Sequence, residues 1–281
     1  MARRILPSFL IIGTPRSGTT SLARYLGAHP EAFMCGRKEL HYFDLHYDRG
    51  LDWYARQFAR AGGKRAVGEA TPQYIYVEEA LARIAQVLPE AKLIVLLRNP
   101  VDRAYSHYWY RRAHGLEDRP FDEIVAAELP ALSTHLPLRR VYLEQGRYLK
   151  YLEQVCRYFP RDALHVEIFE DLRDSPARVY ASVCRFLGVA EGFRPPNLGQ
   201  AVNRFVQFRS LRARSLINRL PRSPRNLLAR LNVRDVPYPP LSPGLRARLD
   251  AAFAPDTAAL TAWLGRDLSV WSRPAPTATG G

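Results

Sequence analysis

The stretch Phe9-Leu-Ile-Ile-Gly-Thr-Pro-Arg-Ser-Gly-Thr-Thr20 decides the fold of this 281-residue chain. Its first four residues, Phe9–Ile12, form the continuous apolar run expected of a strand buried on both faces of a parallel sheet. Gly13 to Gly18 form a loop, and the helical spacing of apolar residues begins at Thr19. A strand, a glycine loop and a helix in this order can bind an anion through backbone N–H groups and the helix N-terminus. An ordinary turn between a strand and a helix has a similar composition, so the loop alone leaves both interpretations open.

The rest of the chain repeats the alternation of strands and helices. Further strands are predicted at Ala66–Glu69, Lys92–Leu97 and Leu164–Phe169. Helices are predicted from Thr19, from Pro100, and over Glu78–Leu88, Arg147–Phe159, Pro176–Leu187 and Leu245–Leu264. This alternation predicts an α/β fold, a single domain with a central parallel sheet flanked by helices. The domain is expected to span residues 1–273, and residues 274–281 are expected to form a disordered tail.

The chain is strongly basic. It has 41 Lys and Arg against 27 Asp and Glu, a formal net charge of +14, and only four of the basic residues are lysines. Nine arginines and no acidic residue lie from Arg204 to Arg234. This charge indicates anionic partners: phosphates, sulfates, acidic glycans, nucleic acid or an anionic membrane face. We expect the segment 204–234 to be a lid over a bound nucleotide, a segment that binds the substrate accepting a transferred group, or a peripheral membrane contact. A solvated basic helix has the same composition and is the alternative.

The cysteines and the apolar runs favour a cytoplasmic protein. Cys35, Cys156 and Cys184 are odd in number and far apart, with neither zinc-ligand spacing nor a disulfide framework. No stretch approaches the ~20 apolar residues that span a bilayer. The short run Phe9–Ile12 has no signal-peptide cleavage site behind it. We therefore expect a soluble protein in a reducing cytoplasm.

The glycine loop differs from that of a nucleotide kinase. The kinase pattern GxxxxGK(S/T) has lysine after its second glycine, where this chain has Thr19. A kinase also needs a carboxylate at a strand end to hold Mg²⁺, whereas the predicted strand Lys92–Leu97 is followed by Arg98. The kinase interpretation stays open as a weaker alternative. So does a basic protein that binds nucleic acid or a membrane surface, but no nucleic-acid-binding motif accompanies the charge, and no nucleic acid is expected as a partner.

Three separated motifs carry the clearest functional signal: TPRSGTTSL (Thr14–Leu22), KELHYFD (Lys38–Asp44) with GLDWY (Gly50–Tyr54), and LLRNPVDRAYSHYW (Leu96–Trp109). Together they resemble the sulfotransferase family that uses 3′-phosphoadenosine-5′-phosphosulfate (PAPS). The first is similar to the family's 5′-phosphosulfate loop and the last to its 3′-phosphate motif. The middle pair is similar to the heparan-sulfate sulfotransferase branch, and the chain resembles a soluble bacterial relative of that branch.

The resemblance implies a P-loop-like sulfotransferase fold. It also implies the in-line transfer of a sulfuryl group from PAPS, without a metal, to a hydroxyl or amine of a glycan, lipid or metabolite. It implies that Glu39 is the general base, that Arg16 stabilises the transferred group, and that His41 assists or orients Glu39. Arg98 and Ser106 are expected to converge on the 3′-phosphate. The expected PAPS-binding residues are Thr14, Pro15, Arg16, Ser17, Gly18, Thr19, Thr20, Arg98, Ser106 and Tyr148.

Two positions depart from the family's pattern. Arg16 stands where lysine is common, and arginine stabilises charge but does not readily donate a proton. Ala70, in GEATPQY (Gly68–Tyr74), stands where the heparan branch often has lysine, so we expect an acceptor other than heparan sulfate. The sequence leaves open the acceptor itself, the choice between O- and N-sulfation, and the oligomeric state.

Overall fold

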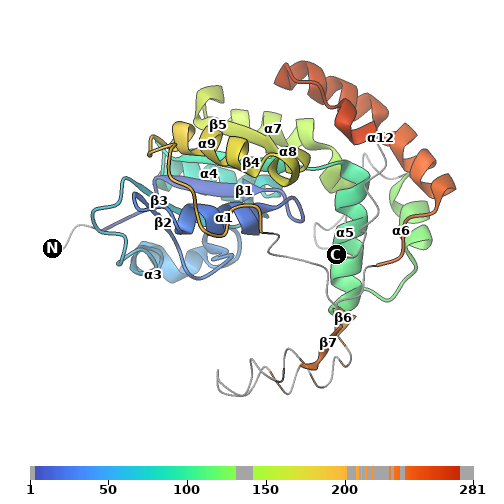
Figure 1. Cartoon of the computed structure of the whole chain (residues 1–281), viewed down its shortest axis with the longest axis horizontal. Coiled ribbons are helices and arrows are strands. Elements are labelled where there is room, and N and C mark those ends of the chain that lie inside the picture. The colour runs from blue at the N-terminus through green and yellow to red at the C-terminus, as the bar shows by residue number, and fades with distance from the viewer. Residues whose placement is uncertain are drawn as a thin grey trace.

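A five-stranded sheet forms the centre of the computed structural model (Figure 1). All its neighbouring strands are parallel, in the order β2-β3-β1-β4-β5. The structure describes residues 4–130, 142–200 and 238–272, together with scattered positions between 201 and 237. The predicted α/β fold with a central parallel sheet is confirmed. The strands are β1 (Phe9–Gly13), β2 (Ala32–Met34), β3 (Ala66–Ala70), β4 (Lys92–Leu97) and β5 (Leu164–Ile168).

The central strand β1 is buried along its whole length and pairs with β3 on one side and β4 on the other. Phe9 lies opposite Gly68 of β3, and a Cβ atom at Gly68 would lie 2.3 Å from the Phe9 ring. A side chain at position 68 would therefore force the two strands apart. The glycine lets an aromatic residue begin the strand that leads into the glycine loop.

Helices cover both faces of the sheet (Figure 1). Leu10 and Ile12 belong to the core that includes α4 and α7, while Phe9 and Ile11 belong to the core that includes α1 and α9. Both faces of β1 are thus buried, which explains its unbroken apolar sequence. A third core joins α5, α6 and α12. The helices named here are α1 (Thr19–Gly27), α4 (Glu78–Val87), α5 (Pro100–Ala113), α6 (Phe121–Glu128), α7 (Tyr148–Cys156), α9 (Pro176–Leu187) and α12 (Pro243–Leu264).

Helix α5 begins immediately after β4 because Asn99 caps it. The Asn99 side chain accepts hydrogen bonds from the backbone N–H groups of Val101 at 2.9 Å and Asp102 at 3.0 Å, and Pro100 occupies the first turn. This short connection places Arg98, at the end of the strand, close to the first turns of α5. It fixes the two elements that carry the predicted 3′-phosphate motif.

Several boundaries differ from the prediction. The sequence pattern does not predict β2, because this edge strand of three residues is too short to show a pattern of its own. The predicted strand Leu164–Phe169 ends at Ile168, since Phe169 begins the short helix α8 (Phe169–Asp174). The predicted helix Arg147–Phe159 is shorter, because α7 ends at Cys156.

Two predicted segments lie wholly or mostly outside the described residues: the tail 274–281 and the arginine-rich segment 204–234. Within the latter, β6 (Gln207–Phe208) and β7 (Val233–Arg234) pair as a short antiparallel ribbon. Among the residues that the structure describes, no helix has the length and apolar character needed to cross a membrane.

Candidate active site

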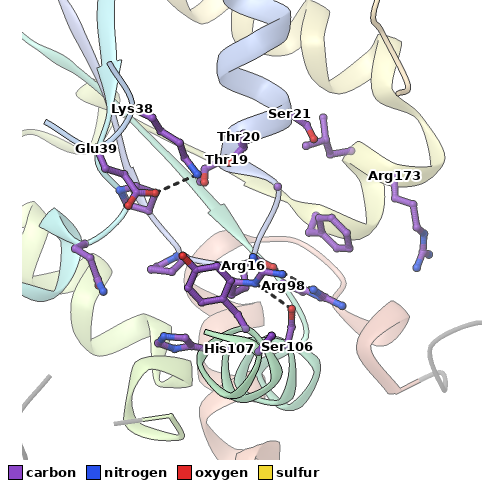
Figure 2. A pocket seen from close by; sticks show the side chains of 18 of the residues that line it. Arg16, Thr19, Thr20, Ser21, Lys38, Glu39, Arg98, Ser106, His107 and Arg173 are labelled. Atoms are coloured by element: carbon purple, nitrogen blue, oxygen red, sulfur yellow. Dashed lines mark hydrogen bonds and ion pairs between the residues drawn. The ribbon is translucent and has the colours of Figure 1, made fainter. Parts of the chain in front are cut away.

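A cavity of about 640 Å³ lies at the carboxyl edge of the sheet. Each of the five strands is followed by a residue that lines it: Arg16 after β1, Glu39 after β2, Gln73 after β3, Arg98 after β4 and Phe169 after β5. Figure 2 shows Arg16, Glu39 and Arg98 around a common space. The carboxyl edge is where open parallel α/β sheets bind their ligands. The position of the cavity therefore follows from the topology.

The glycine loop forms one wall of the cavity. Gly18 has a φ of 87°, in the left-handed region that favours glycine, and a Cβ there would lie 3.0 Å from side-chain atoms of Phe169 and Leu172. Helix α1 starts at Thr19, so the N-terminus of the helix lies at this wall of the cavity. The loop is thus shaped to receive an anion. The expected ligands from this loop that line the cavity are Pro15, Arg16, Gly18, Thr19 and Thr20.

Two expected ligands of the loop do not line the cavity. The hydroxyls of Thr14 and Ser17 lie 2.7 Å apart, and Thr14 also donates to the carbonyl of Leu96 at 2.9 Å. Both residues are fully buried. The Thr14 hydroxyl therefore fastens the loop to the end of β4, and the Ser17 hydroxyl pairs with it.

Arg16, Arg98 and Ser106 meet at the cavity. Arg16 Nε donates to Ser106 Oγ at 3.1 Å, and Arg98 Nη1 donates to the backbone carbonyl of Arg16 at 3.1 Å. Burial lowers the pKa of Arg16, and the positive charge of Arg98 lowers it further. Within the described residues, neither guanidinium has a carboxylate at ion-pair distance. Two positive charges held together without a counterion form a binding site for an anionic group.

Glu39 lies on another wall, beside Lys38 and His41. Lys38 Nζ is 3.1 Å from Glu39 Oε1, and His41 Nε2 is 3.9 Å from Glu39 Oε2. His41 Nδ1 lies 2.8 Å from Asp44 Oδ2, and the pKa of His41 is raised to about 9 by Asp44 first and by Glu39 second. His41 and, to a lesser extent, Lys38 lower the pKa of Glu39. Glu39 is therefore ionised at neutral pH and can accept a proton.

The sequence pattern of the sulfotransferase domain matches residues 6–223. This chain belongs to the sulfotransferase family. The predicted enzyme family is therefore confirmed. The chain is classed neither as a nucleotide kinase nor as a basic protein that binds nucleic acid or a membrane surface. The chain is 30% identical to a solved sulfotransferase from Alicyclobacillus acidocaldarius. The two structures superpose with a TM-score of 0.74, over 96% of this chain and 100% of the other.

Eukaryotic relatives are similar over part of their length. The chain is 35% identical over 197 residues to the human bifunctional heparan sulfate N-deacetylase/N-sulfotransferase 3. This aligned region is 66% of this chain and 22% of the human protein. It is 35% identical over 192 residues to the mouse heparan sulfate glucosamine 3-O-sulfotransferase 6, which is 66% of this chain and 54% of the mouse enzyme. The similarity thus covers about a fifth and about half of these two relatives.

The three predicted catalytic residues of this sulfotransferase share an unusual backbone conformation. Arg16, Glu39 and His41 have φ values of 71°, 54° and 51°. No other non-glycine residue that the structure describes has a positive φ. Such residues are uncommon, and the surrounding structure must hold them in place. Glu39 lines the cavity, but His41 does not. His41 thus lies beside Glu39, 3.9 Å from its carboxylate, and outside the lining of the cavity.

Tyr148 was expected near the nucleotide, but it does not line the cavity of this sulfotransferase. Its side chain is buried, and its hydroxyl donates to the backbone carbonyl of Arg98 at 2.7 Å. Burial raises the pKa of this hydroxyl well above its usual value, so it remains a hydrogen-bond donor. Tyr148 thus contacts the backbone of Arg98 without lining the cavity.

Other cavity residues were missed by the sequence analysis. Tyr110 lies one helical turn after Ser106, and its ring centroid is 5.0 Å from the Arg16 guanidinium; helical spacing on α5 could have indicated it. Phe169 directly follows β5, so the rule that ligands bind at carboxyl ends of strands could have found it. Tyr238 comes from the distant C-terminal part, and no local pattern marks it. The missed lining residues with functional side chains are Ser21, Tyr25, Lys38, Gln73, His107, Tyr110, His114, Phe169, Arg173 and Tyr238.

Proposed function

We propose that this sulfotransferase moves the sulfuryl group of PAPS to an acceptor hydroxyl or amine, with Glu39 as the general base. One observation carries the proposal. The same cavity holds two guanidinium groups without carboxylate partners among the described residues and, on another wall, a carboxylate of lowered pKa (Figure 2). We call Arg16, Arg98 and Ser106 the PAPS end, and Lys38 and Glu39 the acceptor end.

The PAPS end suits the two anionic parts of this substrate. The loop N–H groups and Arg16 bind the 5′-phosphosulfate, and Arg98 with the Ser106 hydroxyl binds the 3′-phosphate. A sulfuryl group carries one negative charge where a terminal phosphoryl group carries two. Arginine and backbone N–H groups are therefore sufficient to neutralise it during transfer, and no metal is required.

The transfer is proposed as an in-line displacement. The acceptor oxygen or nitrogen attacks sulfur, while the bond between sulfur and the bridging phosphate oxygen breaks on the opposite side. The Glu39 carboxylate takes the acceptor's proton, and 3′-phosphoadenosine-5′-phosphate leaves with the bonding electrons. Arg16 stabilises the negative charge that develops on the bridging oxygen. His41, paired with Asp44, keeps Glu39 ionised and oriented.

The acceptor is proposed to be a glycan, lipid or metabolite other than heparan sulfate. Relatives whose names specify heparan sulfate support a glycan. However, position 70 offers a buried alanine where the heparan branch often has a cation. Mass spectrometry of cell extracts incubated with the enzyme and PAPS should reveal products that gain SO₃, with heparan sulfate tested in parallel. Turnover of ATP that depends on Mg²⁺, without any PAPS-dependent product, would contradict the proposal.

The segment Arg204–Arg234 is proposed as a basic lid that helps to hold the 3′-phosphate and recruits an anionic or membrane-associated acceptor. Its support is its charge and Tyr238, which lies four residues after Arg234 and lines the cavity. Adding 3′-phosphoadenosine-5′-phosphate should protect the segment from proteolysis, and the protein should sediment with anionic but not neutral vesicles at low salt. Unchanged cleavage and no sedimentation would contradict both roles. The cytoplasmic location also stays a prediction.

A further inference from the structure

A fully buried carboxylate lies behind the acceptor end, on the interior strand β3. Glu69 has no exposed surface and accepts three hydrogen bonds from hydroxyl groups: Tyr54 at 3.0 Å, Tyr74 at 3.1 Å and Thr71 at 2.7 Å. Burial raises the pKa of Glu69, and the three hydroxyls act against this shift. Burying a carboxylate is costly unless its hydrogen-bonding needs are met. Because Glu69 does not line the cavity, it has no contact with substrate.

Two of these hydroxyls also hold the loop that carries Glu39. The backbone N–H of Tyr42 donates to the Tyr74 hydroxyl at 2.9 Å, and the N–H of His41 points to the Thr71 hydroxyl at a longer 3.5 Å. A hydroxyl has one hydrogen and two lone pairs. Since Tyr74 and Thr71 each give their hydrogen to Glu69, their lone pairs must face the loop. Glu69 therefore sets the direction of both hydrogen bonds.

The loop needs such fixation. Glu39 and His41 have φ values of 54° and 51°, and a left-handed conformation costs an ordinary residue roughly 1–2 kcal/mol. The N–H of Glu39 also donates to the Ala70 carbonyl at 3.1 Å, directly beside Glu69 in β3. Contacts between the end of β3 and the loop thus hold the backbone on both sides of the two strained positions.

We propose that Glu69 is a positioning residue that fixes the Glu39 carboxylate in the cavity, by orienting the Tyr74 and Thr71 hydroxyls toward the backbone of residues 41 and 42. The proposal rests on the role of Glu39 as the base. Tyr54 completes the coordination of Glu69, and its ring stacks on Tyr42 with a centroid distance of 4.3 Å. Among the hydrogen bonds between described residues, none joins the Tyr54 hydroxyl to the loop that carries Glu39.

The two tyrosines give a matched test. Tyr74→Phe and Tyr54→Phe each remove one hydroxyl and one hydrogen bond to Glu69, keep the aromatic ring and leave Glu69 in place. Tyr74→Phe should lose more stability than Tyr54→Phe, because it also removes the acceptor of the Tyr42 N–H. Hydrogen exchange measured by NMR, with the protein saturated with 3′-phosphoadenosine-5′-phosphate, should show the Tyr42 amide losing protection in Tyr74→Phe but not in Tyr54→Phe. With an acceptor that gains SO₃ in the mass-spectrometric assay described above, kcat should fall about 10- to 100-fold in Tyr74→Phe, since a misplacement of 1 Å has an effect of this size.

The outcomes separate this proposal from the proposed function. Equal loss of Tyr42 protection in the two variants, or no loss in either, overturns the positioning role whatever the activity. Protection lost in Tyr74→Phe and in Glu69→Gln but kept in Tyr54→Phe, together with a kcat that falls in the first two variants and stays near the wild-type value in the third, supports it. Full Tyr42 protection in Glu69→Gln overturns it. Full activity of Glu39→Gln would instead refute the general base, and the exchange pattern would still report on how the loop is held.

Discussion

At the PAPS end of the cavity, Arg16 lies three residues after the interior strand β1 and Arg98 directly after the interior strand β4, and within the described residues neither has a carboxylate at ion-pair distance. At the acceptor end, Glu39 lies in a loop after the edge strand β2, and its charge is matched by Lys38 at 3.1 Å and His41 at 3.9 Å. The PAPS end is thus incomplete without an anion, whereas the acceptor end is electrically balanced. We infer that charge drives PAPS binding and that loop geometry determines the transfer.

The largest expected effect separates the two ends directly. Glu39→Gln should reduce turnover by roughly 10²–10⁴-fold, the range for a positioned general base. The affinity for 3′-phosphoadenosine-5′-phosphate should remain nearly unchanged, because the PAPS end is left intact. Turnover at saturating substrate and calorimetric titration of the nucleotide measure the two quantities. Glu153→Gln, on an exposed position of α7, is the matched control. Comparable turnover of both variants would show that the acceptor end does not supply the base.

Arg16 is expected to link the two ends. It hydrogen-bonds Ser106 at the PAPS end, and it lies near enough to Glu39 for the carboxylate to affect its pKa. Arg16→Ala should therefore weaken nucleotide binding and also lower turnover by about 10²–10³-fold, as expected for loss of one group that stabilises developing charge. Arg16→Lys keeps the charge and should retain more of both. A pure loss of affinity, with full turnover at saturating PAPS, would place Arg16 outside the transfer step.

Arg98 should affect binding alone. Removing a charge-assisted contact with the 3′-phosphate should weaken 3′-phosphoadenosine-5′-phosphate binding by about 10- to 100-fold. Binding of AMP, which lacks this phosphate, should change little in Arg98→Ala. Calorimetry with both nucleotides, in the presence of EDTA, tests this selectivity. Arg185→Ala, in the exposed pair with Glu191, serves as the control. An equal loss for both nucleotides would refute the assignment of Arg98 to the 3′-phosphate.

The PAPS end was more accessible to sequence analysis than the acceptor end. The run Phe9–Ile12, the glycine loop, and the eight-residue spacing of Arg98 and Ser106 are local patterns with direct structural meaning. They predicted the central strands, the start of α1 and the loop at the cavity. What they could not show is which side chains of the loop are buried: the hydroxyl of Thr14 bonds to the end of β4 and that of Ser17 pairs with it.

The acceptor end depends on contacts between distant residues. The motif at Lys38–Asp44 indicated Glu39 through family resemblance, but only the structure shows that Asp44 pairs with His41. The role of Glu69 required three hydroxyls from residues 54, 71 and 74 to converge on one buried carboxylate. Tyr238 reaches the cavity from beyond the arginine-rich segment. None of these juxtapositions has a periodic signature in the sequence.

The smallest expected effect concerns the stability of the acceptor end. Asp44 and Glu39 raise the pKa of His41 from 6.5 to about 9. A histidine whose pKa is raised on folding stabilises the folded state fully below its unfolded pKa, and this contribution is lost as the pH rises through the folded pKa. The unfolding free energy should therefore fall between pH 6.5 and 9 through this group.

Asp44→Asn should remove most of that pH dependence. The Asp44 side chain is 7% exposed and that of His41 23%, so screening by solvent is limited and the difference from the wild type should reach about 1–2 kcal/mol below pH 6.5. It should shrink toward pH 9, because His41 then loses its proton in both proteins. Urea unfolding at several pH values measures this difference, with Asp48→Asn, at an exposed position of the same region, as the control.

A difference between the wild type and Asp44→Asn that is constant across this range would mean that His41 is already neutral. Glu39 would then owe its low pKa to Lys38 and not to an imidazolium, and the balance of charge at the acceptor end would rest on an exposed lysine.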